Sequence, residues 1–207
     1  ILGVLTERLL ATAALSENDL TALAQTPASA FGTCRHVLQP EEAERLIDVL
    51  KAHDIGYFFY NGCGGAARAC LDVLAIATQF AYPLNVIHIP KTIDNDLPAT
   101  DCSLGFGSAA KYLATSLREA SLDLASVASS STKVFILETM GRYSGWLTLA
   151  CGLALQGQPE EAYLLLLPEL AFDESIFLAK VESIVAQYGY CVIAVAEGVV
   201  DKNGQTL

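Results

Sequence analysis

The chain has 207 residues, of which 53% are hydrophobic and only 17% are charged. This composition excludes a disordered chain, and the length is sufficient for one sizeable core or two small ones. The formal net charge of −11 argues against general binding to nucleic acid or to an anionic membrane. A chain this acidic needs its few cationic side chains gathered locally if it is to bind an anionic ligand.

A mean hydropathy of +0.41 raises the question of a membrane-spanning segment. The longest stretch without Asp, Glu, Lys or Arg is Val73–Pro90, which is interrupted by Pro83. A spanning helix needs about 20 predominantly apolar residues, so a helix, a turn and a buried strand explain the stretch better. The first residues, Ile-Leu-Gly-Val, show no basic start of a signal peptide. We therefore expect a cytoplasmic protein that binds neither membrane nor nucleic acid.

The six cysteines form no C-x-x-C pair, which argues against a structural zinc site. Without a secretory signal they are expected to be reduced thiols, mostly small core residues. They are Cys34, Cys63, Cys70, Cys102, Cys151 and Cys191.

Helix-like and strand-like segments alternate from Pro40 onward. Helices are predicted over residues 40–53, 66–80, 108–125 and 147–155, with one more that Asp173 caps and whose buried stripe ends at Tyr188. Strands are predicted over residues 55–60, 84–89, 134–137, 163–167 and 190–196. The strand at 84–89 has the continuous apolar pattern of a strand buried on both faces. This alternation favours an α/β fold with a mostly parallel sheet.

Ligands of such sheets bind beyond the carboxyl ends of the strands. The loop after Ile89 reads Pro-Lys-Thr-Ile-Asp-Asn-Asp and has the strongest chemical pattern. Asp94 can take a proton from a hydroxyl, Asp96 can hold Mg²⁺, and Lys91 can neutralise a phosphate. An ordinary solvated acidic turn is the alternative explanation for this string.

Three further loops follow predicted strands. Met140–Trp146 contains two glycines that permit close backbone approach and an arginine that can bind a phosphate through two bonds. Ala196–Gly198 places a carboxylate at the end of an apolar strand, and Asn61–Gly65 can present backbone N–H groups at a helix start. Each of these, taken alone, is also compatible with an ordinary turn.

Together these loops strongly resemble the 6-phosphofructokinase family, and the resemblance spans essentially the whole chain. The segments that carry it are Pro90–Asp96, Gly105–Lys111, Met140–Gly145 and Ala196–Gly198. Lys91, combined with Gly-Phe-Gly-Ser-Ala-Ala-Lys at 105–111, resembles the pyrophosphate-dependent branch of the family.

The resemblance implies a role for each loop residue. Asp94 matches the base that deprotonates the 1-hydroxyl of fructose 6-phosphate, and Thr92 matches a residue holding that hydroxyl and the transferring phosphoryl group. Asp96 matches a residue that assists magnesium. Lys91 replaces the glycine of ATP-using members and would bind pyrophosphate in its place. The implied cofactor is Mg²⁺.

The same resemblance assigns the remaining site residues. The donor phosphates would be bound by Gly62, Gly64, Gly65, Arg35 and Lys91. The sugar-phosphate site would be formed by Met140, Gly141, Arg142, Glu197 and Lys133, the last often acting across a subunit interface.

The resemblance also implies two Rossmann-like lobes with mostly parallel sheets, incomplete at both ends. Residues 1–104 would form part of the pyrophosphate lobe and residues 105–207 part of the fructose 6-phosphate lobe. The expected protein is a homo-oligomer, either a dimer or a tetramer, that transfers phosphoryl reversibly between pyrophosphate and fructose 6-phosphate in glycolysis.

The glycine-rich turn departs from the family pattern, because Gly64 stands where the family usually has Asp or Asn and Ala66 replaces a hydroxyl residue. Two alternatives therefore remain open. One is a catalytically impaired member or regulatory subunit that binds sugar phosphate. The other is an ATP-dependent 6-phosphofructokinase.

Overall fold

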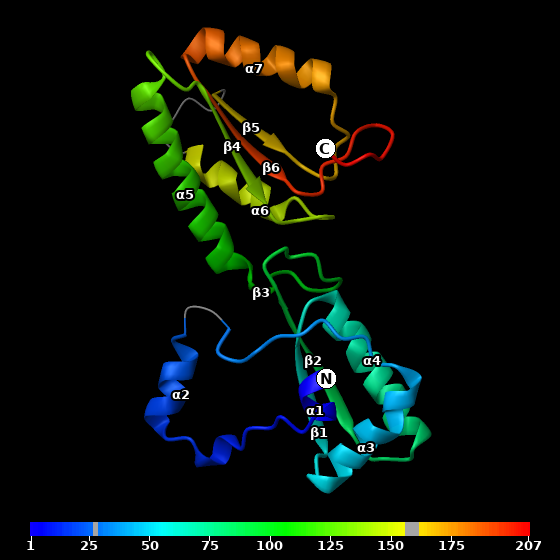
Figure 1. The fold of residues 1–207 in the computed structure, drawn as a ribbon. Helices are drawn as coiled ribbons and strands as arrows, with labels where there is room; N and C mark the ends of the chain where they lie inside the picture. The colour runs from blue at the N-terminus through cyan, green and yellow to red at the C-terminus, as the bar shows by residue number, and fades with distance from the viewer. Residues whose placement is uncertain (27–28, 156–161) are drawn as a thin grey trace. The chain divides into compact units, whose positions relative to one another are not determined.

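A computed structural model describes residues 1–26, 29–155 and 162–207 (Figure 1). The chain divides into two compact units, Ile1–Ile89 and Pro90–Leu207. These two units are defined by contacts within the chain. The predicted boundary after residue 104 separates lobes by the substrate that each would bind, and it stays a prediction.

The first unit is built from short helices and the beginning of a sheet. Its elements are α1 (Leu2–Leu5), η1 (Thr12–Ala14), α2 (Glu17–Ala24), η2 (Pro40–Glu42), α3 (Ala43–Ala52), β1 (Tyr57–Gly62), α4 (Gly64–Gln79) and the first residues of β2 (Asn85–Thr92). Pro40 and the acidic residues after it begin the predicted helix, as expected from the preference of negative charge for a helix N-terminus. Its core contains Leu46, Leu50 and Val73, each at most 1% exposed.

The expectation that residues 84–89 are buried on both faces is wrong. β1 and β2 are neighbours in one sheet, and their side chains alternate between a covered and an exposed face. Phe58 and Leu84 pack in the core, whereas Phe59, Ile87 and Ile89 are exposed. In the described part of this unit the buried core lies against one face of these strands only, so an apolar sequence alone overestimated burial.

The second unit contains the larger sheet. Its elements are the end of β2, β3 (Leu104–Gly105), α5 (Phe106–Val127), β4 (Val134–Thr139), α6 (Trp146–Cys151), η3 (Gly152–Leu155), β5 (Tyr163–Leu166), α7 (Glu174–Tyr188) and β6 (Cys191–Ala196). Three strands pair in the order β4-β6-β5, all parallel, and β2 pairs in parallel with β3. Helices cover both faces of the three-stranded sheet (Figure 1). The prediction of an α/β fold with parallel sheets is confirmed.

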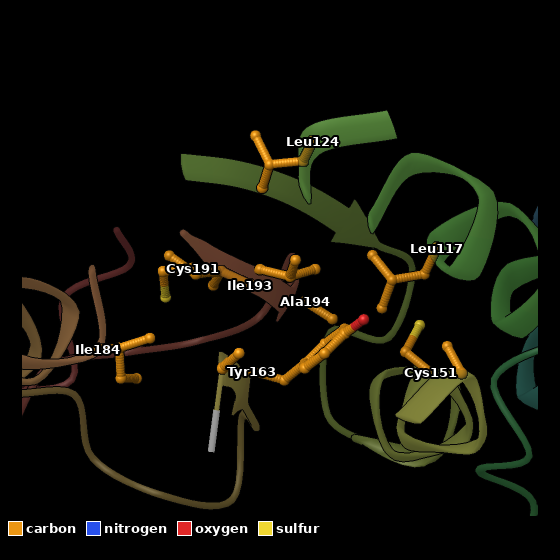
Figure 2. Close-up of a cluster of buried hydrophobic side chains, with 11 residues drawn as sticks. Leu117, Leu124, Cys151, Tyr163, Ile184, Cys191, Ile193 and Ala194 are labelled. Carbon is orange, nitrogen blue, oxygen red and sulfur yellow. The ribbon is translucent and has the colours of Figure 1, made fainter. Parts of the chain in front are cut away.

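The core of this unit lies between the three-stranded sheet and its helices. β6 is its centre, with Cys191, Val192, Ile193 and Ala194 at most 1% exposed. Figure 2 shows side chains from α5, α6 and α7 around that strand. Leu117 and Leu124 of α5 belong to the cluster, and so does Ile184 of α7, which confirms the predicted buried stripe of the helix that Asp173 caps.

Helix ends follow local capping chemistry. The Asp173 carboxylate accepts hydrogen bonds from the backbone N–H groups of Ser175 and Ile176, and α7 ends at Gly189 with φ of 85°. The glycine-rich turn differs from expectation, because α4 begins at Gly64 rather than Ala66. Gly64 and Gly65 therefore form the first helical turn instead of a loop.

The cysteines divide equally between core and surface. Cys70, Cys151 and Cys191 are buried free thiols, and burial raises the pKa of the last two to about 11. The exposed free thiols are Cys34, Cys63 and Cys102, so the expectation of mostly buried cysteines is wrong for these three. No helix in the described ranges is long and apolar enough to cross a membrane.

Two tyrosines give opposite predictions for the same substitution. The Tyr82 hydroxyl lies 3.1 Å from the Leu50 carbonyl oxygen and 2.7 Å from that of Ile55. The buried Tyr163 hydroxyl, in contrast, has no hydrogen-bond partner among the described residues. Since an unmade buried hydrogen bond costs about 1–3 kcal/mol, Tyr82→Phe should lower the free energy of unfolding by about 1 kcal/mol. Tyr163→Phe should leave it unchanged or raise it.

Urea denaturation followed by circular dichroism measures both changes. Tyr57→Phe is the matched control, because Tyr57 is 65% exposed. Destabilisation by Tyr163→Phe equal to that by Tyr82→Phe would contradict this assignment of the two hydroxyls.

Candidate active site

The Pro90–Asp96 segment forms a compact bend at the end of β2. The strand continues through Lys91 to Thr92, further than its apolar residues indicated. Thr92 is 4% exposed, and its hydroxyl accepts a hydrogen bond of 3.2 Å from the Asp94 backbone N–H. This bond turns the chain immediately after the strand, so that Lys91 and Asp94 stay within electrostatic reach of one another.

Asn95 fixes the loop that follows. It has φ of 54°, a left-handed conformation that asparagine tolerates better than most residues. Its side-chain oxygen accepts from the Ser103 backbone N–H (2.8 Å), and its amide donates to the Asp101 carbonyl (3.3 Å). Asn95 therefore closes the 95–103 loop from inside, a role that the sequence motif did not reveal.

The Asp94 carboxylate is placed where its charge is unfavourable. Its Oδ1 atom is buried and has no hydrogen-bond partner in the described part of the chain. Burial raises the pKa of Asp94, the charges of Asp96 and Glu197 raise it further, and Lys91 opposes them. A carboxylate with a free, poorly solvated oxygen is well suited to accept a proton from a bound hydroxyl.

The turn after β4 is held by glycine geometry. Gly141 has φ of 127°, and a Cβ atom there would lie 2.2 Å from the Ser144 carbonyl oxygen. Its backbone N–H donates to Glu197 Oε1 at 3.3 Å. The close approach of the chain to itself therefore requires glycine, and Glu197 is bonded to the turn that contains Arg142.

Gly198 secures the same turn from the other side. A Cβ atom at Gly198 would lie 1.8 Å from the carbonyl oxygen of Arg142, so the two backbones are in direct contact. The Glu197 N–H donates to the Thr139 carbonyl at 2.9 Å, which continues the pairing of β4 with β6. Met140, Gly141, Arg142 and Glu197 thus lie together at this end of the sheet. Gly198, which stood in the Ala196–Gly198 motif without a role of its own, holds the two segments in contact.

Two more side chains connect this turn to its surroundings. The Ser144 hydroxyl donates to the Asp94 carbonyl at 2.8 Å, and the Gly145 N–H donates to Glu169 Oε1, also at 2.8 Å. A hollow beside them is lined in part by Asp96, Tyr143 and Glu169. Sequence reasoning gave no role to Ser144, although it lies in the Met140–Trp146 loop, and it did not single out Glu169. Their contacts bring together segments far apart in sequence.

Lys133 lies apart from the residues at the strand ends. It is exposed and immediately precedes β4, whereas Met140 follows the other end of that strand. Six strand residues span about 20 Å, so Lys133 does not reach the 140–145 turn of its own chain. Its predicted action across a subunit interface stays a prediction.

The glycine-rich turn belongs to the first unit. His88 Nε2 lies 2.9 Å from the Gly62 carbonyl, which can only accept, so that ring nitrogen carries the hydrogen. Gly64 and Gly65 are exposed in the first turn of α4, where backbone N–H groups have no acceptor within the helix. Arg35 is also exposed. These residues can offer N–H groups and a positive charge to an anion.

The carboxylates of the second unit could hold magnesium only together with ligands from substrate phosphates and water. No group of three or more His, Cys, Asp or Glu side chains in the described ranges is arranged to hold a metal ion. Mg²⁺ is usually held by one or two carboxylates together with substrate phosphates and water. The exposed Asp96 fits that arrangement, and Asp94 is left free to accept a proton.

Comparisons with known proteins agree with these features. Residues 2–207 match the model of the family described as Phosphofructokinase. The chain belongs to the phosphofructokinase family. It is 51% identical over 212 residues to the pyrophosphate–fructose 6-phosphate 1-phosphotransferase of Halomonas elongata, covering 100% of this chain and 51% of that protein.

Further relatives give the same result. The Xanthomonas campestris pv. campestris protein of that name is 51% identical over 210 residues, covering 99% of this chain and 50% of its own length. The crystal structure of a pyrophosphate-dependent phosphofructokinase from Nitrosospira multiformis matches with a TM-score of 0.90 and 52% identity. That match covers 99% of this chain and 51% of the other. The chain thus spans about half the length of these relatives.

The electrostatics of Asp94 predict a stability effect. The folded protein binds the Asp94 proton more tightly than the unfolded chain does, so protonation of Asp94 stabilises the fold. This contribution to the free energy of unfolding is complete below about pH 3.8 and is lost as pH rises through the elevated pKa. At neutral pH the charge is therefore destabilising. Asp94→Asn should raise the melting temperature at pH 7 by about 1–3 °C, and the gain should shrink toward pH 4.

Differential scanning calorimetry measures this change, with Asp101→Asn as the control on an exposed loop residue. A melting temperature that falls at pH 7 in Asp94→Asn would show that the carboxylate has a stabilising partner, contrary to the structure.

Proposed function

We propose that this chain carries the reacting groups of a pyrophosphate-dependent 6-phosphofructokinase. The reaction is reversible phosphoryl transfer from pyrophosphate to the 1-hydroxyl of fructose 6-phosphate. The observation that carries the proposal is the buried, unpaired oxygen of Asp94 beside Asp96, Glu197 and Lys91. The names of the similar proteins from Halomonas elongata and Xanthomonas campestris support the same substrates.

In this proposal Asp94 accepts the proton of the sugar 1-hydroxyl. Thr92 holds the reacting groups, and Lys91 balances the negative charge of the donor. Phosphoryl transfer depends on in-line positioning and charge neutralisation more than on covalent catalysis. Asp96 would hold Mg²⁺ together with donor oxygens, and the ion would supply further positive charge at the phosphates.

The sugar phosphate would be bound at the turn after β4. Arg142 would bind the phosphate, with Met140 and Gly141 beside it. Glu197 would accept hydrogen bonds from sugar hydroxyls with its second oxygen, because Oε1 already accepts from Gly141. In a homo-oligomer, a dimer or a tetramer, Lys133 would serve the site of a neighbouring subunit.

The pyrophosphate would be bound by Gly62, Gly64, Gly65 and Arg35 together with Lys91. The backbone N–H groups at the start of α4 would donate hydrogen bonds to the donor phosphates. We place the reaction in glycolysis and in the cytoplasm, where the six free thiols would remain reduced.

Removal of the base tests the proposal directly. Asp94→Asn should lower kcat by about 10²–10⁴-fold while the KM for fructose 6-phosphate stays within about twofold. A coupled assay for fructose 1,6-bisphosphate measures this, with Asp101→Asn expected to retain wild-type turnover. Binding of fructose 6-phosphate by calorimetry without turnover in the wild-type protein would instead favour the impaired or regulatory alternative.

The donor is tested at Lys91. Loss of a charged hydrogen-bond donor costs about 1.5–3 kcal/mol, so Lys91→Met should lower kcat/KM for pyrophosphate by about 10–100-fold. Lys51→Met is the matched control, because Lys51 is an exposed residue of α3. Turnover of wild-type protein with ATP and not with pyrophosphate would favour the ATP-dependent alternative and contradict the role given to Lys91.

A further inference from the structure

Ser144 joins two parts of the candidate site that are 50 residues apart in sequence. Its side chain is 7% exposed, and its hydroxyl donates a 2.8 Å hydrogen bond to the backbone carbonyl of Asp94. That carbonyl belongs to the residue whose carboxylate holds the buried, unpaired oxygen. The bond therefore acts on the backbone that sets the direction of the Asp94 side chain.

Ser144 is itself held on both sides. Its carbonyl oxygen is where a side chain on Gly141 would collide, at 2.2 Å, so the 141–144 turn is tightly closed. On the other side, the Gly145 N–H donates to Glu169. A serine fixed in this way can impose a position on Asp94 rather than follow it.

The turn that contains Ser144 is also the predicted sugar-phosphate turn. Gly141 is bonded to Glu197, and Gly198 packs against the backbone of Arg142. Ser144 belongs to this turn, and its hydroxyl is bonded to the Asp94 carbonyl. The turn and the Asp94 backbone are therefore joined by a direct hydrogen bond within the second unit.

We propose that Ser144 is a positioning residue, whose hydroxyl sets the Asp94 carboxylate relative to the sugar-phosphate turn. The part of this inference that concerns catalysis rests on the proposed function. A misplacement of about 1 Å of a catalytic group can cost about 10²-fold in rate. Loss of the Ser144 bond should therefore reduce turnover while leaving substrate affinity largely intact, because Arg142 and Glu197 are unchanged.

The test compares Ser144→Ala with Ser103→Ala. Ser103 is a matched control, because it is 2% exposed and its hydroxyl has no hydrogen-bond partner among the described residues. The substitution does not affect the Ser103 backbone N–H, which donates a hydrogen bond to the Asn95 side-chain oxygen. Ser144→Cys keeps the size of the side chain with a weaker donor, and it covers the case in which the alanine variant fails to fold.

Hydrogen exchange of peptides covering residues 92–97 gives a readout that needs no activity. The Asp94 N–H, bonded to Thr92, is the reporter. Ser144→Ala should increase its exchange rate at least about tenfold, Ser144→Cys should be intermediate, and Ser103→Ala should match the wild type. The proposal would be overturned if Ser144→Ala exchanged at the wild-type rate. If only Ser144→Cys folds, a wild-type exchange rate in that variant would overturn it instead.

Kinetics then separate positioning from a merely structural effect. In Ser144→Ala, kcat should fall about 10–100-fold, with KM values for fructose 6-phosphate and pyrophosphate within about twofold of wild type. A raised KM with unchanged kcat would overturn the positioning role. If the wild-type protein shows no turnover, the proposed function fails, and the exchange measurement still decides whether Ser144 positions Asp94.

Discussion

The parallel pairing of β4 with β6 determines where the candidate site can form. Its register places Thr139 opposite Ala196, so the 140–145 turn and Glu197-Gly198 leave the sheet at the same edge. The Glu197 N–H extends the pairing by one bond, and Gly198 brings the second chain into contact with the Arg142 backbone. A side chain at either Gly141 or Gly198 would separate these turns. The glycines are therefore required by packing between backbones, and the carboxylate and guanidinium groups depend on that packing for their positions.

The site combines this rigid backbone with unfavourable electrostatics. Asp96 and Glu197 are close enough to raise the pKa of Asp94, and among the described residues only Lys91 is seen to lower it. Such an arrangement lowers the stability of the protein, and a metal ion or a ligand could supply the balancing positive charge. Rigid positioning and an unpaired carboxylate belong together, since a mobile loop would let Asp94 turn toward water and regain its solvation.

Much of the fold was predictable because it depends on local chemistry. The alternation of helix and strand, the Asp173 cap and the α5 and α7 stripes are all properties of short windows of sequence. The burial of only one face of β2 was not predictable, because an apolar sequence pattern does not show which elements pack on each face of a strand. The motif residues of the site could be named in advance, although their roles remain proposals. Ser144, Asn95 and Gly198 stand within the same motifs, but their structural roles could not be predicted, because those roles arise from contacts across the fold.

The glycines of this chain fall into two groups: those that close packing requires and those with open space around them. A Cβ atom at Gly62, Gly141 or Gly198 would collide with a neighbour at 2.7 Å or less, whereas Gly64 and Gly65 have nothing within 4 Å. The departure from the family pattern at Gly64 is therefore not imposed by lack of space, and an aspartate would fit there. What the position retains is a backbone N–H at the start of a 16-residue helix, with its partial positive charge. A backbone donor to an anion is thus retained at position 64, which is why the altered turn does not by itself argue against binding of a phosphorylated donor.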